Sequence, residues 1–397
     1  MFESNLIITL YLLPEKVNTI KVVVKDIRSN IKLLILFSTA ILILIKFKKT
    51  YLLGILLIFV LITIEFSYLS SITVNNRKFL ASEKLKEKAG FNDYTIEAVR
   101  FIKNIDNSFY RINKDFHSNY TEHLGLNDAQ YQQYYGTSNY HSFNQKYYIR
   151  FLDAFEVIDA KKENQSRWAM GLGNTPILQT FASIKYSLSK SEAPFHLKFY
   201  YKQIGKTGDV KILQNNNYLP LGFTYDTYIT RSVFESFKLL QKYFLVFKAF
   251  IINDEDTGNF QGYSSFAVKD STTDLSFNEF IRITNILKQD TLNITSFSEN
   301  KIEGTIELEK EKLLFFSIPF DDGWRAYVNG QEKELKLVNI GFMGLMLDEG
   351  QHHIVLSYTS PFVTAGAIIS LIMIFVTVLL LFFEKKTKRK FINQGSI

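Results

Sequence analysis

The sequence predicts an integral membrane protein in which about three transmembrane α-helices carry a large extracytoplasmic α/β region that ends in an antiparallel β-sandwich. Long charge-free apolar runs lie near both ends of the 397-residue chain, although hydrophobic residues make up only 47% of it. Aromatic residues reach 15%, which suits large packed sheet faces. The chain has no cysteine, so its exposed part must be held together by its core and not by disulfides.

Three apolar runs are predicted to cross the membrane. Residues 33–45 form a short run bracketed by lysines, whose side chains must extend toward the headgroups to fit a hydrocarbon layer of about 30 Å. Residues 51–74 are long enough to cross and are interrupted only by Glu65, and residues 362–383 carry no charge. The predicted organisation is, in order, an amino-terminal segment 1–76, a mixed α/β domain 77–259, a β-sandwich 260–361, the third helix 362–383 and a basic tail 384–397.

Positive charges beside the apolar runs predict the orientation. Three lysines lie between 46 and 49, and five Lys and Arg residues lie between 385 and 390. Placing both clusters in the cytoplasm follows the positive-inside tendency, although four basic residues between 21 and 32 then fall outside. We therefore expect a multi-pass protein of the cell membrane with residues 77–361 external. Because the basic clusters serve as such anchors, we expect no nucleic-acid partner.

The first half of the external region has the pattern of a mixed α/β domain. Asp93 is a candidate cap for an amphipathic helix that runs to about residue 104. A second amphipathic helix is predicted over 232–248. Apolar and β-branched runs predict strands at 108–115, 184–188, 195–201 and 209–213.

The second half predicts a β-meander. Apolar residues alternate with charged or polar ones over 302–309, which is typical of a half-buried strand. Asn329-Gly330 is the strongest short-range signal for a type I′ hairpin. Further strands are predicted at 313–320, 324–328, 333–338, 341–347 and 353–358, with a turn at 348–350. Together they predict the sandwich, placed directly before the third helix.

Two residues are candidates for ligand binding. Glu65 is an intramembrane carboxylate, and such groups are often functional. Alternatively its side chain extends to the outer headgroups, since the helix becomes polar just beyond it. Trp324 is either a stacking platform for a ligand or a core residue beneath its hairpin.

No cofactor and no metal site is predicted. His352 and His353 are adjacent on a predicted strand, so their side chains face opposite ways and cannot chelate one metal together. Residues 253–258 resemble part of a calcium loop but lack its late bidentate acid. The sequence has no phosphate-binding glycine loop and no nucleophile elbow, and it identifies no catalytic residue.

A series of segments in this chain resembles one family. In the second half these are the strand 313–320, the motif DDGWRAYVNG at 321–330, and residues 339–347 and 350–358, followed by the last apolar run. Upstream matches lie at 108–112, 135–142, 182–186 and 219–223. In this order the segments resemble the carboxy-terminal half of the YfhO family of bacterial multi-pass membrane proteins.

The resemblance implies a glycosyltransferase-like membrane architecture, similar to that of enzymes that move a sugar from a polyprenyl-phosphate carrier to an outer-surface acceptor. It also implies a link to glycosylation of cell-envelope polymers such as lipoteichoic acid. Family members are longer, and their amino-terminal half supplies most membrane helices and the loop that holds the catalytic acid. We therefore expect this chain to be the carboxy-terminal half of such a protein.

Two functions follow from this resemblance. In the first, the chain is the acceptor-side half of a transferase. Its partners would be the lipid bilayer, an envelope glycopolymer, a polyprenyl-phosphate sugar and a separate chain carrying the missing helices. In the second, it is a non-catalytic membrane protein that binds or scaffolds envelope glycopolymer. A neighbouring reading frame for the missing helices would favour the first, and whether the chain is an enzyme stays open.

Overall fold

The structure is a computed structural model that describes residues 31, 35–39, 41–42, 46, 51–75, 83, 87–118, 125–173, 175–199, 201–267 and 275–394. The chain divides into two compact units, Met1–Ala81 and Ser82–Ile397, and each is described by itself. Part of the predicted run 33–45 lies outside the described residues; those described within it, 35–39 and 41–42, are helical.

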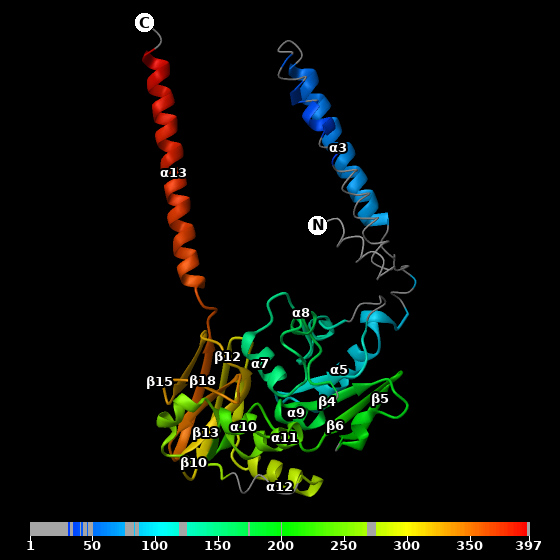
Figure 1. The fold of residues 1–397 in the computed structure, drawn as a ribbon, viewed down its shortest axis with the longest axis vertical. Coiled ribbons are helices and arrows are strands. Elements are labelled where there is room, and N and C mark those ends of the chain that lie inside the picture. Colours follow the sequence, from blue (N-terminus) through cyan, green and yellow to red (C-terminus); the bar gives the residue numbers. More distant parts are fainter. Residues whose placement is uncertain are drawn as a thin grey trace, which may run out of the picture. The chain divides into compact units, whose positions relative to one another are not determined.

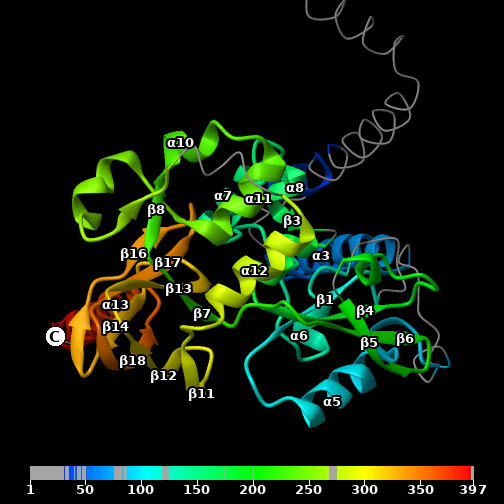
Figure 2. The same cartoon turned by 90° about the horizontal axis from the view of Figure 1, so that it is seen from below.

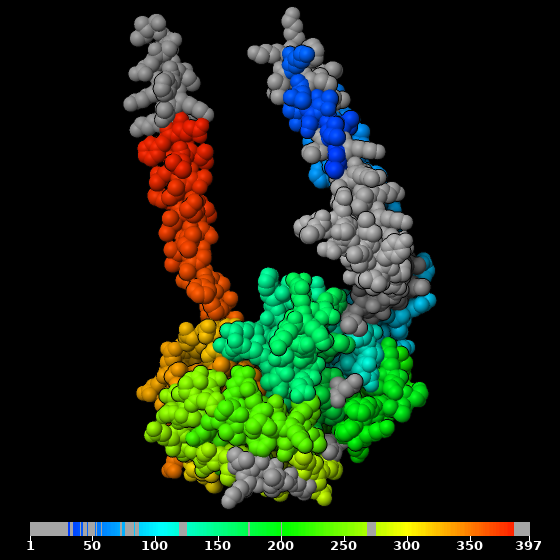
Figure 3. All heavy atoms as spheres, in the orientation of Figure 1, coloured from blue at the N-terminus to red at the C-terminus, as the bar shows by residue number. Residues whose placement is uncertain are grey.

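Among the described residues, two helices are long and apolar enough to cross a membrane (Figure 1). In the first unit α3 (Tyr51–Asn75) has 25 residues, and in the second unit α13 (Val363–Gln394) has 32. At 1.5 Å per residue they measure about 38 and 48 Å, enough for a hydrocarbon layer of about 30 Å. Side chains from Val363 to Glu384 are exposed, and this part of α13 projects clear of its unit (Figure 3). The helix continues past the predicted end at residue 383 because Lys and Arg are good helix formers.

The second unit contains a four-stranded mixed sheet in the order β1-β4-β6-β5. β1 runs parallel to β4, and the other pairs are antiparallel. Helix α5 packs on β5 and β6, and the core between them includes Val99, Ile102 and Ile212. The bounds are α5 (Thr95–Ile105), β1 (Arg111–Lys114), β4 (Ile184–Ser189), β5 (Tyr201–Thr207) and β6 (Val210–Asn215).

The prediction of a strand over 195–201 is wrong. Residues Phe195–Lys198 form the 3-10 helix η3, and strand β5 begins only at Tyr201. Pro194, immediately before η3, has no N–H to give to a strand ladder. The buried His196 instead lies within hydrogen-bonding distance of Asn113 and Gln179.

The helix predicted over 232–248 is divided into α10 (Arg231–Glu235) and α11 (Leu239–Lys248). Lys238 has an extended backbone with φ −68° and ψ 153°, so the helical hydrogen bonds cannot run through it.

A phenylalanine-rich core joins the helices to the sheets. It includes Phe151, Phe181, Phe247 and Phe315, all fully buried. In both ribbon views α11 and α12 lie between the mixed sheet and the sandwich strands (Figures 1 and 2). The elements around this core are α7 (Lys146–Ala154), α9 (Pro176–Phe181), α11, α12 (Phe277–Leu287) and the small sheet β10-β8-β9, with β8 (Thr227–Thr230), β9 (Phe250–Ile252) and β10 (Ser264–Ser265).

The last part of the second unit forms the predicted antiparallel β-sandwich. One sheet has the order β11-β12-β18-β14-β15 and the other β16-β17-β13-β7. Their inner faces meet in a core that includes Ile306 and Leu356 from the first sheet and Phe316 and Leu345 from the second. The bounds are β7 (Gly222–Tyr225), β11 (Asn293–Phe297), β12 (Lys301–Leu308), β13 (Lys312–Pro319), β14 (Trp324–Val328), β15 (Gln331–Lys333), β16 (Lys336–Val338), β17 (Phe342–Leu347) and β18 (Gly350–Tyr358).

Two features of the sandwich differ from the predicted meander. The strand predicted over 333–338 is split, because β15 pairs with β14 in one sheet whereas β16 pairs with β17 in the other. The chain thus crosses between the sheets at residues 334–335. In addition, β7 comes from upstream of residue 260 and pairs with β13.

The hairpin at Asn329-Gly330 is confirmed. Both residues have positive φ, 51° and 83°, as a type I′ turn requires. The Asn329 side chain also accepts a hydrogen bond from the His353 backbone N–H. The remaining short elements are η2 (Gly90–Asn92), α6 (Asp128–Tyr131), β2 (Asn139–Tyr140), α8 (Glu163–Arg167), β3 (Trp168–Ala169) and η4 (Asp254–Phe260).

Candidate functional site

The two residues predicted from the sequence lie in different units. Glu65 is on α3 with its side chain partly exposed. Trp324 begins β14, where its ring centroid lies 5.1 Å from that of Tyr358 and it packs against the sandwich core. This packing agrees with the core alternative for Trp324. A ligand-binding role for either residue stays a prediction.

The structure brings together a different set of residues, in a cavity of about 660 Å³ that we call the aromatic cleft. Three segments form it: Lys103 near the end of α5 with residues 106–110 after it, the segment 129–135 that begins in α6, and Phe297 at the end of β11 with Glu299 just beyond. The third segment is more than a hundred residues from the other two along the chain. The cleft therefore exists only in the folded second unit.

Aromatic rings line one part of the cleft. Phe109 lies 5.4 Å from Tyr135 and 4.5 Å from Phe297, and Tyr135 lies 5.5 Å from Phe297, all between ring centroids. Phe109 and Phe297 also pack against the sandwich core. Tyr135 remains 48% exposed. A partly exposed ring held by two others is a preformed apolar surface that a ligand can contact.

Polar and charged side chains surround these rings. Asp106 accepts hydrogen bonds from the Tyr186 hydroxyl at 2.8 Å and from Ser108, and it is ion-paired with Lys185 at 2.6 Å. Burial alone would raise the pKa of Asp106, but the hydrogen bonds from Lys185 and Ser108 hold the pKa below its ordinary value. Asp106 is therefore a charged structural acceptor and not a proton donor at neutral pH.

Gln133 gives the cleft wall an unusual backbone. Its φ is 58°, in the left-handed region that costs a non-glycine residue on the order of 1 kcal/mol. The Lys103 ammonium donates to the Gln133 carbonyl at 2.8 Å. Strain of this kind persists where neighbouring contacts require it, and it is common at binding sites.

Behind the aromatic rings, Arg111 fixes the floor of the cleft to the sandwich. Its guanidinium donates to the Ala182 carbonyl at 2.8 Å and to the Ser317 hydroxyl and carbonyl at 3.0 and 2.9 Å. It also lies 5.2 Å from the centroid of the Phe109 ring. Burial lowers the pKa of Arg111 to about 10, which leaves it charged at neutral pH.

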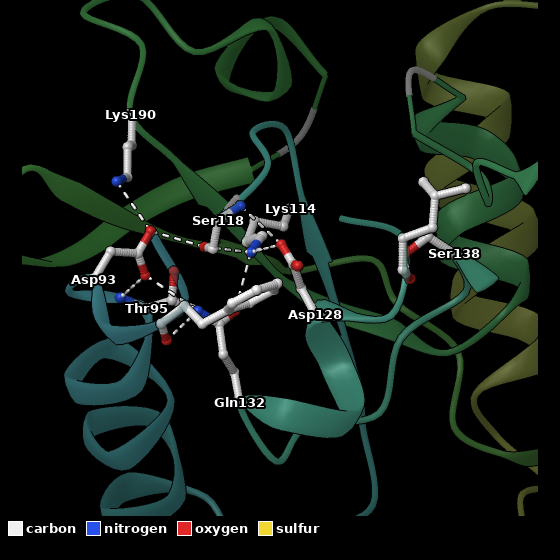
Figure 4. Close-up of polar contacts among 10 residues, drawn as sticks. Asp93, Thr95, Lys114, Ser118, Asp128, Gln132, Ser138 and Lys190 are labelled. Atoms are coloured by element: carbon white, nitrogen blue, oxygen red, sulfur yellow. Dashed lines mark hydrogen bonds and ion pairs between the residues drawn. The ribbon is translucent and has the colours of Figure 1, made fainter. Parts of the chain in front are cut away.

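A buried polar cluster positions the α6 wall of the cleft (Figure 4). Lys114 donates to Asp128, to the Ser118 hydroxyl at 2.7 Å and to the Gln132 side chain at 3.0 Å. The side chains of Lys114 and Asp128 are only 5% and 3% exposed. Asp128 and Gln132 belong to the same segment as Ala129, Gln130 and Gln133, which line the cleft. The cluster thus holds one side of this segment while the other side faces the cavity.

Asp93 closes the same cluster at the start of α5. One of its oxygens accepts from the Thr95 N–H at 3.0 Å and from Gln132, and the other accepts from Ser118 and is 3.0 Å from the Lys190 ammonium. Burial opposes ionisation of Asp93, but hydrogen bonds from Thr95, Ser118 and Lys190 lower its pKa. The sequence predicted Asp93 as the cap of this helix, but Tyr94 occupies the N-cap position of α5 and makes no side-chain cap hydrogen bond. Asp93 lies one residue earlier and accepts from the N–H of Thr95, the first residue of the helix.

A second cavity, of about 690 Å³, lies over β12 and β18 near the hairpin. Its lining includes Asn293, Glu307, Asn329, His352 and His353, and none of the described Phe, Tyr or Trp residues contributes to it. Within the described residues there is no group of three or more His, Asp or Glu side chains that could hold a metal ion. The aromatic cleft therefore combines apolar and polar groups better than this larger cavity.

Sequence reasoning missed the aromatic cleft, although one signal pointed to it. The segments 108–112 and 135–142, singled out for their resemblance to the YfhO family, include Ser108, Phe109 and Tyr135. Neither segment contains a spacing that would associate it with the other or with β11. The site became visible only through the fold.

Comparisons with known proteins agree with the resemblance. A family profile described as "Bacterial membrane protein YfhO" matches residues 4–272 and 271–370. A stretch of 91 residues is 30% identical to a Bacillus subtilis (strain 168) protein described as "Uncharacterized protein YfhO". That stretch is 23% of this chain and 10% of the relative, so the match spans about a tenth of the relative's length. No solved structure matches the chain.

Proposed function

This chain belongs to the YfhO family of bacterial membrane proteins, and from that membership we propose that its second unit takes part in glycosylating a cell-envelope polymer such as lipoteichoic acid. In this proposal the unit is the acceptor-side outer domain. The sugar arrives on a polyprenyl phosphate, which is bound by the amino-terminal membrane helices that the family resemblance implies. The single observation that supports it best is the aromatic cleft, whose mixed apolar and hydrogen-bonding lining suits carbohydrate.

The proposed orientation rests on charge. The carboxy-terminal end of α13 carries five Lys and Arg residues between 385 and 390. Cytoplasmic placement of this cluster puts the residues before α13 outside the membrane. An external domain is where an envelope polymer would meet the cleft.

A non-catalytic role in binding or scaffolding glycopolymer is the second candidate. One observation favours it: the hydrogen-bonded Asp106 has a lowered pKa, which is the opposite of what a general acid needs. The cleft thus suits binding and positioning of a polymer better than catalysis of sugar transfer to that polymer. Under both candidates the cleft binds carbohydrate, and they differ in whether transfer depends on the chain.

The test is sugar transfer in a bacterial host without other family members. The full chain is expressed with and without a second chain carrying amino-terminal family helices, and sugar on the envelope polymer is measured by mass spectrometry. We expect transfer only when both chains are present, and a drop of about tenfold with Tyr135→Ala. Phe143→Ala is the matched control, because Phe143 is 88% exposed and does not line the cleft.

Two outcomes would contradict the proposal. Transfer that is unchanged in Tyr135→Ala would separate the cleft from the reaction and leave the scaffolding role. Transfer by this chain alone that is abolished by Glu65→Gln would make the intramembrane carboxylate the functional group and overturn the acceptor-side assignment.

A further inference from the structure

The lining of the aromatic cleft carries information about which part of a polymer it can bind. Envelope polymers present sugar rings and, in anionic polymers, phosphodiester groups. These two moieties need opposite surroundings. A sugar ring needs an apolar face together with neutral hydrogen-bonding groups, whereas a phosphate needs cationic donors, above all Arg or Lys.

Neutral hydrogen-bonding groups are present around the exposed ring of Tyr135. Asn107, Gln130 and Gln133 all line the cleft and are exposed. In the described part of the chain the side-chain amides of these three residues form no hydrogen bond with the protein. Each amide offers both donors and an acceptor, which matches the dual character of a sugar hydroxyl.

Cationic groups that could hold a phosphate are already engaged. Within the part of the chain that the structure describes, Lys103 is the lysine that lines the cleft, and its ammonium donates to the Gln133 carbonyl. Lys185 is ion-paired with Asp106. Arg111 donates to Ala182 and Ser317 on the inner side of Phe109.

Negative charge at the rim opposes a phosphate further. Glu299 lines the cleft and is exposed, and no ion pair of it occurs among the described residues. It lies close enough to Tyr135 to add to the rise in the pKa of that phenol that burial causes. Of the two carboxylates among the described residues that line the cleft, Asp106 is ion-paired with Lys185, so Glu299 is the one whose charge is left to repel an anion.

We propose that the aromatic cleft binds an uncharged pyranose ring of the polymer, stacked on Tyr135, and excludes the phosphodiester backbone. This inference deepens the proposed function and rests on it. If it holds, the domain recognises polymer that already carries sugar, and the backbone passes outside the cleft.

Binding to the full chain in lipid nanodiscs tests this inference. The probes are a neutral hexose oligosaccharide, an N-acetylhexosamine oligosaccharide and a synthetic glycerol-phosphate oligomer without sugar, each followed by saturation-transfer NMR and by titration. We expect a neutral sugar to bind with an affinity that does not change between about 50 and 500 mM NaCl, because no ion pair forms. Tyr135→Ala should weaken that affinity about tenfold, whereas Phe143→Ala should leave it unchanged.

Glu299→Lys provides the converse test. Reversing this charge should allow the glycerol-phosphate oligomer to bind, with an affinity that falls as salt rises. Tighter binding of that oligomer than of either sugar to the unchanged protein would overturn the inference. Binding of none of the three probes would overturn it as well.

The binding experiment and the transfer assay can fail independently, so failure of the sugar subsite can be distinguished from failure of the proposed function. Loss of sugar binding in Tyr135→Ala with full transfer in cells would leave the sugar subsite standing and refute its part in glycosylation. Loss of transfer in Tyr135→Ala with preferred phosphate binding would retain the proposed function and refute the sugar subsite.

Discussion

Replacing Lys114 by Met removes the cation from the buried cluster beside the cleft. The side chains of Lys114 and Asp128 are 5% and 3% exposed, so water cannot take over the lost contacts. Breaking a buried ion pair by deleting one partner costs about 3–5 kcal/mol, because the other charge stays buried. Lys190 cannot compensate, since its ammonium is already ion-paired with Asp93 and Asp209. We expect the unfolding free energy of Lys114→Met to fall by about this amount.

The assay is urea denaturation of the full chain in detergent micelles, followed by tryptophan fluorescence. Trp168 is a useful reporter because its ring lies 4.3 Å from Tyr140 within the second unit. Lys162→Met is the matched control: its ion pair with Asp159 is exposed, with side chains 61% and 42% accessible. The control should change the unfolding free energy by less than about 0.5 kcal/mol.

A double variant separates the net contribution of the ion pair to the unfolding free energy from the cost of leaving one of its charges buried without a partner. Burial lowers the pKa of Lys114 more than the neighbouring Asp128 raises it, so the desolvation cost of the ammonium offsets part of its attraction to Asp128. Lys114→Met combined with Asp128→Leu should therefore recover much of the stability lost in the single variant. A loss below about 1 kcal/mol in Lys114→Met would refute the reasoning.

Three further predictions concern the hairpin, acid stability and topology. Gly330→Val should lower the unfolding free energy by about 1 kcal/mol or more in the same denaturation assay, because φ at Gly330 is 83°, although the space around the new Cβ is open. Gly258→Val is the control, since the space around Gly258 is equally open and its φ is not positive. Equal losses of unfolding free energy in the two variants would contradict the argument. The hydrogen bond from Arg282 lowers the pKa of Glu279 to about 2, against the effect of burial and with help from Lys248. The ionised Glu279 therefore adds stability above about pH 4.5, and this stability is lost as the pH falls toward 2. Glu279→Gln should flatten the plot of unfolding free energy against pH in this range, and an unchanged slope would contradict this account. Because the chain has no cysteine of its own, a single introduced cysteine reports its side of the membrane. A cysteine at the exposed position 329 (Asn329→Cys) should react with an impermeant maleimide in intact cells, whereas Lys388→Cys should react only after permeabilisation; the reverse pattern would mean the opposite orientation. Asn215 is buried and is therefore not used.

Local sequence signals predicted those parts of the fold that depend on neighbouring residues. The alternation over 302–309 gave β12 almost residue for residue, and Asn329-Gly330 gave its turn type, because side-chain periodicity and turn chemistry are both local. The break in 232–248 and the start of β5 were missed. Pro194 was a local signal against the strand that the prediction did not use, whereas the contacts of the buried His196 form only after folding, and local patterns contain no record of them.

The candidate site could not be predicted for the same reason. A cleft made of residues 106–110, 129–135 and the end of β11 has no spacing signature, and its residues are common types. Glu65 and Trp324 were chosen because each is conspicuous alone: a charge in an apolar run and a rare aromatic residue. A shared surface of ordinary Phe, Tyr, Gln and Asn side chains becomes recognisable only when the chain is folded.

The sandwich and the mixed α/β part are coupled through shared strands and side chains. β7 pairs with β13, and its Phe223 and Tyr225 lie in the phenylalanine-rich core that extends under the helices. Arg111 on β1 adds a link, since it donates to Ser317 on β13. Separating the sandwich at residue 260 would remove β7, expose an edge of β13 and leave Phe297 without Phe109 and Tyr135. The cleft lies across this junction, so its shape depends on both parts being folded together, and any ligand bound there would contact both at once.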